Sequence, residues 1–165
     1  MESDESDNSS LPCLASCLIG GHVIDPGTVR DVARFRKSER ARLYALRKAI
    51  PVDRARAMAT AVSAELARTI PQVAGARIAV YWPIRGELDL RDWMGSLDHS
   101  GMIVALPVVV EVDQPVEFHR WAPGSRMKRG IWNIPVPENV EKVQPDIVVV
   151  PLLGVDETHI LQVSR

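Results

Sequence analysis

Three short apolar runs constrain the fold of this chain more than any other feature. They are ARIAVYWP (residues 76–83), MIVALPVVV (102–110) and DIVVVP (146–151). Each run is apolar over nearly its whole length, which is typical of strands that are buried on both faces of a parallel sheet. A helical pattern separates the first two runs. The sequence therefore predicts an α/β fold with a mostly parallel sheet flanked by helices.

Apolar residues spaced three and four apart predict three helices. The predicted helices span residues 28–49, 52–70 and 89–97. Thr28 is the expected N-cap of the first helix, and Asp31 completes a capping box. Pro71 is expected to end the second helix, because the residue before a proline disfavours the helical conformation.

The remaining segments are predicted to be less regular. Residues 114–124 alternate between polar and apolar types, which favours an edge strand or a hairpin arm. Residues 125–139 are interpreted as a loop because Pro135 and Pro137 disrupt regular structure. Residues 152–156 should form a short loop after the last strand. Residues 1–27 are predicted to be a disordered or irregular extension, which leaves 28–165 as the α/β domain.

Composition limits the possible classes of protein. The chain has 165 residues, 46% of them hydrophobic and 25% charged, which suits one globular domain with a tail. Its net charge of -1 gives no general attraction to nucleic acid or to an anionic membrane. No stretch approaches the ~20 apolar residues that span a bilayer, so the expected location is the cytosol. The four histidines and two cysteines show no metal-binding spacing.

Basic residues are concentrated in the first two predicted helices, between residues 30 and 56. Arg36 and Arg40 are four residues apart and share a helix face, and Lys37 lies beside them. Such a group can bind the phosphates of a nucleotide or of a nucleic acid. The alternative is a solvated helix face without a ligand.

A second candidate site follows the first predicted strand, in the stretch YWPIRGELDL. Glu87 lies there between a buried strand and a helix, where a carboxylate can accept hydrogen bonds from ligand N–H groups. Tyr81 and Trp82 can stack on a planar ring. The alternative is that Glu87 only favours the N-terminus of the following helix through the helix dipole.

The third candidate is Trp132, in the proline-flanked stretch GIWNIPVP. Its ring can form the wall of a ligand site, or it can anchor the loop on the core. Neither a phosphate-binding loop nor a dinucleotide-binding glycine pattern occurs in the chain.

These stretches, in this order, resemble the 5-formyltetrahydrofolate cyclo-ligase family. The similar pieces are RKSERARLYALRKAI, IAVYWPIRGELDL, GMIVALPVV, VEFHRWAPGSRMKRGIWNIPVP and PDIVVVPLLGVD, which together cover residues 34–156. The resemblance implies a Rossmann-like sheet. It also implies an ATP- and Mg²⁺-dependent carbon–nitrogen ligase that converts 5-formyltetrahydrofolate into 5,10-methenyltetrahydrofolate, ADP and phosphate.

The resemblance also implies roles for individual residues. Arg36 and Arg40, with Lys37 as an alternative, match the positions that contact the nucleotide. Glu87 matches the folate-contacting glutamate, and Trp82 and Trp132 would lie by the folate pocket.

The family's last matching strand continues into a glycine-rich loop that binds the phosphates and helps to hold magnesium. Here Asp156 is followed by ETHILQVSR instead. We therefore expect the C-terminal part of the sheet and the ATP and magnesium half of the site to be missing, which makes cyclisation by this chain doubtful. The apolar residues Val148–Val150 and Leu152 should lie at a poorly covered edge. The other hypotheses are a non-catalytic folate-binding module and a nucleic-acid-binding protein that uses residues 30–56.

Overall fold

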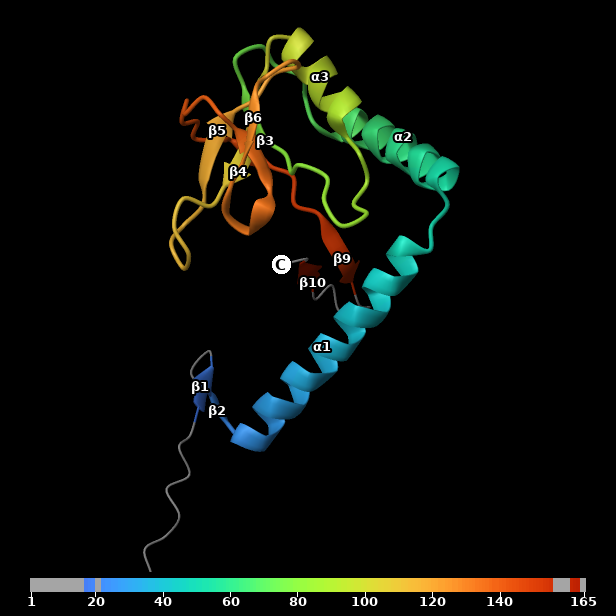
Figure 1. Cartoon of the computed structure of the whole chain (residues 1–165), viewed down its shortest axis with the longest axis vertical. Helices are drawn as coiled ribbons and strands as arrows, with labels where there is room; N and C mark the ends of the chain where they lie inside the picture. The colour runs from blue at the N-terminus through green and yellow to red at the C-terminus, as the bar shows by residue number, and fades with distance from the viewer. Residues whose placement is uncertain (1–16, 20–21, 156–160, 164–165) are drawn as a thin grey trace, which may run out of the picture. The chain divides into compact units, whose positions relative to one another are not determined.

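The structure, a computed structural model, describes residues 17–19, 22–155 and 161–163. The chain divides into two compact units, residues 1–41 and 42–165, and the boundary falls inside the first helix. The helices are α1 (Pro26–Lys48), α2 (Val52–Thr69) and α3 (Arg91–His99), labelled in Figure 1. All three predicted helices are confirmed. In the part of the chain that the structure describes, no helix is long and apolar enough to cross a membrane.

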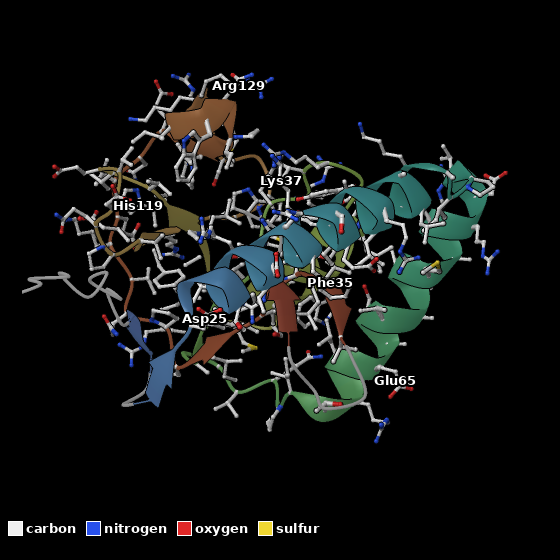
Figure 2. The ribbon with its side chains drawn as sticks, turned by 90° about the horizontal axis from the view of Figure 1, so that it is seen from below. Asp25, Phe35, Lys37, Glu65, His119 and Arg129 are labelled. Carbon is white, nitrogen blue, oxygen red and sulfur yellow. The ribbon has the colours of Figure 1, made fainter. Side chains whose placement is uncertain are left out.

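Helix α1 begins earlier than its sequence pattern predicted. The Asp25 carboxylate accepts a hydrogen bond from the Thr28 N–H at 3.0 Å, and its carbonyl accepts one from the Val29 N–H at 3.2 Å. Asp25, labelled in Figure 2, is therefore the N-cap, and the predicted cap at Thr28 is wrong. Pro26 explains the difference, since the fixed φ of proline suits the first helical position.

A short antiparallel pair of strands precedes α1, in a stretch predicted to be irregular. The strands are β1 (Cys17–Ile19) and β2 (His22–Ile24). The acidic residues 2–7 lie outside the described part of the chain.

The main sheet confirms the predicted α/β class. Its strands are β3 (Arg77–Ala79), β4 (Ile103–Val108), β5 (Glu117–Arg120) and β8 (Ile147–Val148), in the order β5-β4-β3-β8. Strand β3 pairs in parallel with both β4 and β8, and β5 pairs antiparallel with β4. The predicted edge strand within residues 114–124 is thus confirmed as β5.

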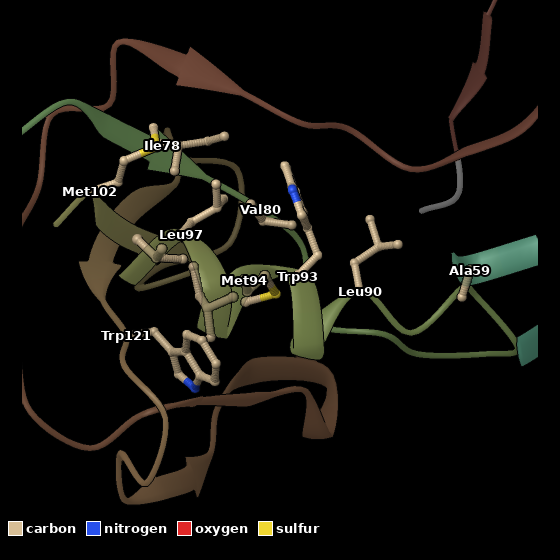
Figure 3. Packing of buried hydrophobic residues seen from close by; sticks show 11 residues of the cluster. Ala59, Ile78, Val80, Leu90, Trp93, Met94, Leu97, Met102 and Trp121 are labelled. Atoms are coloured by element: carbon tan, nitrogen blue, oxygen red, sulfur yellow. The ribbon is translucent and has the colours of Figure 1, made fainter. Parts of the chain in front are cut away.

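The core forms where α3 packs against the centre of this sheet. Ile78 and Val104 of the sheet belong to one cluster with Met94 and Leu97 of the helix and with Trp121. Figure 3 shows Ile78, Met94, Leu97 and Trp121 in this cluster. On the opposite face of the sheet, Ala79 and Ala105 are also completely buried. Burial on both faces explains why the β3 and β4 sequences are apolar without alternation.

Strand β8 differs from the other two apolar runs, because it is an edge strand. Val148, Val150 and Leu152 are 50%, 51% and 40% exposed. The prediction of a third fully buried strand is wrong. The expected poorly covered edge is confirmed for Val148, Val150 and Leu152, whereas Val149 packs against the core. The exposed Val148, Val150 and Leu152 alternate with the half-buried Ile147 and Val149, so one face of this edge segment is open to solvent.

The prediction of a loop over residues 125–139 is also wrong. Strands β6 (Met127–Arg129) and β7 (Pro135–Pro137) form an antiparallel pair there. The Gly130 N–H donates a hydrogen bond to the Ile134 carbonyl at 2.9 Å. The Glu138 N–H donates one to the Arg126 carbonyl, also at 2.9 Å. Pro135 and Pro137 occupy the alternate positions, whose backbone nitrogens face away from β6, so neither proline removes a hydrogen bond.

The segment after β8 is a strand as well. Residues Leu152–Val155 form β9, which pairs antiparallel with β10 (Leu161–Val163), although a loop was predicted. Asp156 and the expected divergence from the glycine-rich loop lie outside the described residues.

Replacing Leu97 by alanine should destabilise the second unit strongly. Leu97 is completely buried between α3 and the sheet, and Leu→Ala changes at such sites cost about 2–5 kcal/mol. Urea unfolding should show this loss, while Val73→Ala, at an exposed loop position, should stay within ~0.5 kcal/mol of the parent. A similar loss for both variants would contradict the packing described here.

The start of the parallel sheet is held by an ion pair that should make stability depend on pH. Asp146 accepts hydrogen bonds from the backbone N–H and guanidinium of Arg77. These bonds from Arg77 hold the pKa of Asp146 below its ordinary value. The stabilisation is therefore present above the unfolded-state pKa of about 3.9 and lost as the pH falls through the lowered pKa. In Asp146→Asn, urea midpoints measured from neutral to acidic pH should fall less steeply than in the parent.

Candidate functional site

A groove of about 1040 Å³ lies at the carboxyl ends of β3 and β8, within the second unit. Its walls come from residues 43–48 at the end of α1, from α2, from the loop after β3, and from residues 149–153. Ligands of α/β proteins bind where parallel strands end, because the connecting loops diverge there. Position and size make this groove the candidate functional site.

The loop after β3 turns sharply, and the turn places Glu87 in the groove. The Glu87 N–H donates to the Ile84 carbonyl at 3.0 Å, while the Glu87 carboxylate accepts the Ile84 N–H at 3.1 Å. Gly86 has φ +78°, a backbone conformation that favours glycine. A Cβ at Gly86 would lie 3.5 Å from the Arg47 side chain, which is an ordinary contact distance. The backbone conformation therefore favours glycine here, and the Arg47 side chain lies close to the loop.

Glu87 is largely buried and lies opposite a cation. Its side chain is 5% exposed, and one carboxylate oxygen lies 3.8 Å from Nη1 of Arg47. Helix α3 begins only at Arg91, and the acidic residue of its first turn is Asp92. Glu87 therefore contacts its own loop and the end of α1. These contacts do not support the alternative in which Glu87 serves the helix N-terminus.

Tyr81 forms part of the same wall. Its hydroxyl donates to the Leu88 carbonyl at 2.9 Å. Burial of the phenol raises the pKa of Tyr81 to about 12, and the nearby charge of Glu87 acts in the same direction. Tyr81 is therefore a neutral hydrogen-bond donor at physiological pH.

The remaining walls combine apolar surface with positive charge. Met58, Val62 and Leu66 of α2 face the groove, and Lys48 and Arg54 are exposed cations on its lining. Such a surface suits a ligand that has a flat apolar body and an anionic end.

Trp82 lies beside a different hollow, of about 560 Å³. Its ring makes an edge contact with Trp121, with 6.4 Å between the ring centroids. The Arg91 guanidinium lies 5.1 Å from the Trp82 centroid. The structure therefore does not bring Trp82 and Glu87 into one pocket.

Trp132 is 65% exposed and lies on the short turn Ile131–Asn133 between β6 and β7. The hypothesis that it anchors its loop on the core is wrong, because its ring is mostly in solvent. Its φ of +55° is unusual for a tryptophan. A role as a ligand wall stays a prediction.

Arg36, Lys37 and Arg40 lie on α1, as predicted, within the first unit. Arg36 and Lys37 are exposed, whereas Arg40 is half-buried. Their contact with a nucleotide stays a prediction, as do the folate contacts of Glu87, Trp82 and Trp132.

Arg47 was not singled out from the sequence, although its side chain lies opposite the Glu87 carboxylate in the structure. Its signal was hidden in the dense basic stretch of residues 30–56, in which every arginine resembles a surface residue. Only the meeting of α1 with the loop after β3, 40 residues later, distinguishes it.

Within the described residues, no group of three His, Cys, Asp or Glu side chains is placed to hold a metal ion. Magnesium requires several oxygen ligands. The groove offers the Glu87 carboxylate, which already contacts Arg47 and Ile84. Magnesium is usually held by one or two carboxylates together with ligand phosphates and waters, so magnesium binding stays a prediction.

The fold and the groove define an α/β protein with a candidate ligand site at the ends of its parallel strands. The sequence model of the 5-formyltetrahydrofolate cyclo-ligase family matches residues 32–159. This match covers most of the chain, and the chain belongs to that family. No curated protein matches it in sequence.

Two solved structures share this fold, and both are 5,10-methenyltetrahydrofolate synthetases. The Aquifex aeolicus structure is 23% identical, with a TM-score of 0.59 over 73% of this chain and 62% of that chain. The Mycoplasma pneumoniae structure is 15% identical, with a TM-score of 0.56 over 74% of this chain and 66% of that one. This chain therefore spans slightly less than two thirds of each structure.

The tyrosine at the groove provides a direct test of its environment. The chain has two tyrosines, so the tyrosinate absorbance lost in Tyr81→Phe reports Tyr81 alone. That difference should titrate near the raised pKa of about 12. Because an unfolded tyrosine ionises at about pH 10, stability should also fall as the pH rises from about 10 to 12. A difference titration centred at about pH 10 would mean that the phenol is in solvent.

Proposed function

We propose that the chain binds 5-formyltetrahydrofolate in the groove and takes part in its ATP-dependent conversion to 5,10-methenyltetrahydrofolate. The observation that carries this proposal is the buried carboxylate of Glu87, at the carboxyl end of β3 in a cyclo-ligase fold. Both solved relatives are named for this product. The proposed activity is that of a carbon–nitrogen ligase of one-carbon metabolism, and a cytosolic location stays a prediction.

The groove and a reduced folate are chemically complementary. The pterin ring carries N–H groups, which the Glu87 carboxylate can accept as hydrogen bonds. The ring itself fits against the apolar wall of α2. The glutamate end of the folate carries carboxylates, and Lys48 and Arg54 supply exposed positive charge on the groove lining. Glu87 would thus orient the ring while the cations hold the tail.

The chemical difficulty of the reaction is that a formyl oxygen is a poor leaving group. Transfer of the ATP γ-phosphoryl group to that oxygen makes it a good one, so that N10 can attack the carbon and phosphate can leave. A protein mainly positions the two ligands and stabilises phosphoryl charge in such a reaction. We propose that Arg36, Lys37 and Arg40 contact the nucleotide phosphates. No step is assigned to magnesium.

Two tryptophans complete the proposed set of folate contacts. Trp82 and Trp132 are aromatic residues that can stack on the folate. Trp132 is exposed, and the ring edge of Trp82 already contacts Trp121. Trp132 is thus the freer of the two to receive a ligand, which supports it as the better stacking candidate.

Replacing Glu87 by glutamine should weaken folate binding. The amide keeps the shape but loses the charge, and hydrogen bonds to a charged group contribute about 1.5–3 kcal/mol. Isothermal titration with 5-formyltetrahydrofolate should therefore show an affinity about 10- to 100-fold lower for Glu87→Gln. Glu138→Gln, which lies outside the groove, is the matched control and should bind like the parent.

Catalysis is tested separately from binding. The parent chain is incubated with Mg-ATP and 5-formyltetrahydrofolate, and the absorbance of the methenyl product is followed. Product formation supports the full proposal. Folate binding without product formation would indicate a folate-binding module without catalysis. A parent chain that binds neither ligand would contradict the proposed function.

A further inference from the structure

We propose that Arg47 is a positioning residue for Glu87, which it holds in the orientation that the ligand meets. This inference rests on the proposed function where it concerns the folate. The effect of Arg47 on the loop after β3 does not depend on that function.

Arg47 connects three elements that are distant in the sequence. It lies in the last turn of α1. Its Nη2 donates a hydrogen bond to the Leu152 carbonyl at the start of β9, while Nη1 lies 3.8 Å from the Glu87 carboxylate. The guanidinium also lies 5.8 Å from the Tyr44 ring centroid. The Arg47 side chain is only 13% exposed, so these contacts fix its position.

The buried Nη1 atom of Arg47 makes no hydrogen bond in the structure. A separation of 3.8 Å is an ion-pair distance but too long for a hydrogen bond. A small shift of the Glu87 carboxylate, or a ligand oxygen placed between them, would satisfy this donor. A ligand in the groove can therefore complete the hydrogen bonding of Arg47 Nη1.

Charge and shape both favour arginine at this position. Burying a carboxylate is costly, and a nearby cation offsets part of that cost. The planar guanidinium can point two donors at two acceptors at once, toward Leu152 and toward Glu87. A lysine would supply the charge at a single point. Arg47→Lys should therefore restore part of the function that Arg47→Met loses.

The experiment measures folate affinity in the full chain by isothermal titration. The variants are Arg47→Met, Arg47→Lys, Glu87→Gln and the double variant Arg47→Met/Glu87→Gln. Arg47→Met should weaken binding on the order of 10- to 100-fold. The double variant should bind within about threefold of the weaker single variant, because both changes disrupt the same contact.

A second readout does not need the folate. The Ile84 amide is hydrogen-bonded to the Glu87 carboxylate, so its hydrogen exchange reports the position of that carboxylate. In Arg47→Met this amide should exchange at least about tenfold faster. The amides of β4 should keep the exchange rates of the parent, which shows that the fold is intact.

The matched control is an exposed pair with the same chemistry. Arg68 and Glu65 on α2 are bonded at 2.7 Å, with side chains 75% and 68% exposed. Figure 2 shows Glu65 projecting from the helix. Arg68→Met, Glu65→Gln and their combination should change neither folate affinity nor Ile84 exchange.

The outcomes separate the two proposals. If the parent binds folate, additive losses in the double variant, or parent-like affinity in Arg47→Met, would overturn the inference. If the parent binds no folate, the proposed function fails, and Ile84 exchange alone decides the inference. Faster exchange in Arg47→Met with partial recovery in Arg47→Lys then supports positioning, and unchanged exchange refutes it. If Arg47→Met does not fold, the same two measurements, folate affinity and Ile84 exchange, are compared between Arg47→Lys and the parent.

Discussion

The parallel pairing of β3 with both β4 and β8 is the constraint on which the rest of the second unit depends. This pairing places β3 at the centre of the parallel part of the sheet, where its side chains are buried on both faces. Parallel strands require crossover connections, so α3 must cover the sheet between β3 and β4. The same pairing aligns the carboxyl ends of β3 and β8. The loop that carries Glu87 and the segment that carries Leu152 therefore meet at one end of the sheet.

The central elements could be predicted from the sequence because their signals are local. Continuous apolar runs identified β3 and β4, and spacings of three and four residues identified all three helices. The predictions that were wrong concern features decided by tertiary neighbours. The sequence DIVVVP contains no signal that β8 is an edge strand. The residues near Pro135 and Pro137 likewise give no signal that both proline nitrogens face away from β6.

The candidate site shows the same division between local and tertiary signals. Glu87 was identifiable because it follows a buried strand and because its neighbourhood resembles the family. Arg47 was not, since its role depends on a partner 40 residues away and its sequence context is uniformly basic. Burial is what separates it from its neighbours: the side chain of Arg47 is nearly enclosed, whereas Lys48 beside it is exposed. A dense cluster of like residues hides its most buried member until the structure shows which one it is.

The segment after β3 and the segment after β8 are stabilised in different ways, and this difference bears on function. The loop after β3 is fixed by its own hydrogen bonds, by the Tyr81 hydroxyl and by the proximity of Arg47. Residues 148–152 have exposed valines and an edge position, and the Arg47 bond to Leu152 links them to α1. Apolar edges are less stably held than central strands, because fewer neighbours must separate when they open. The Glu87 side of the groove is therefore its rigid wall. The Leu152 side is the wall that can adjust to a ligand, and Arg47 couples the two.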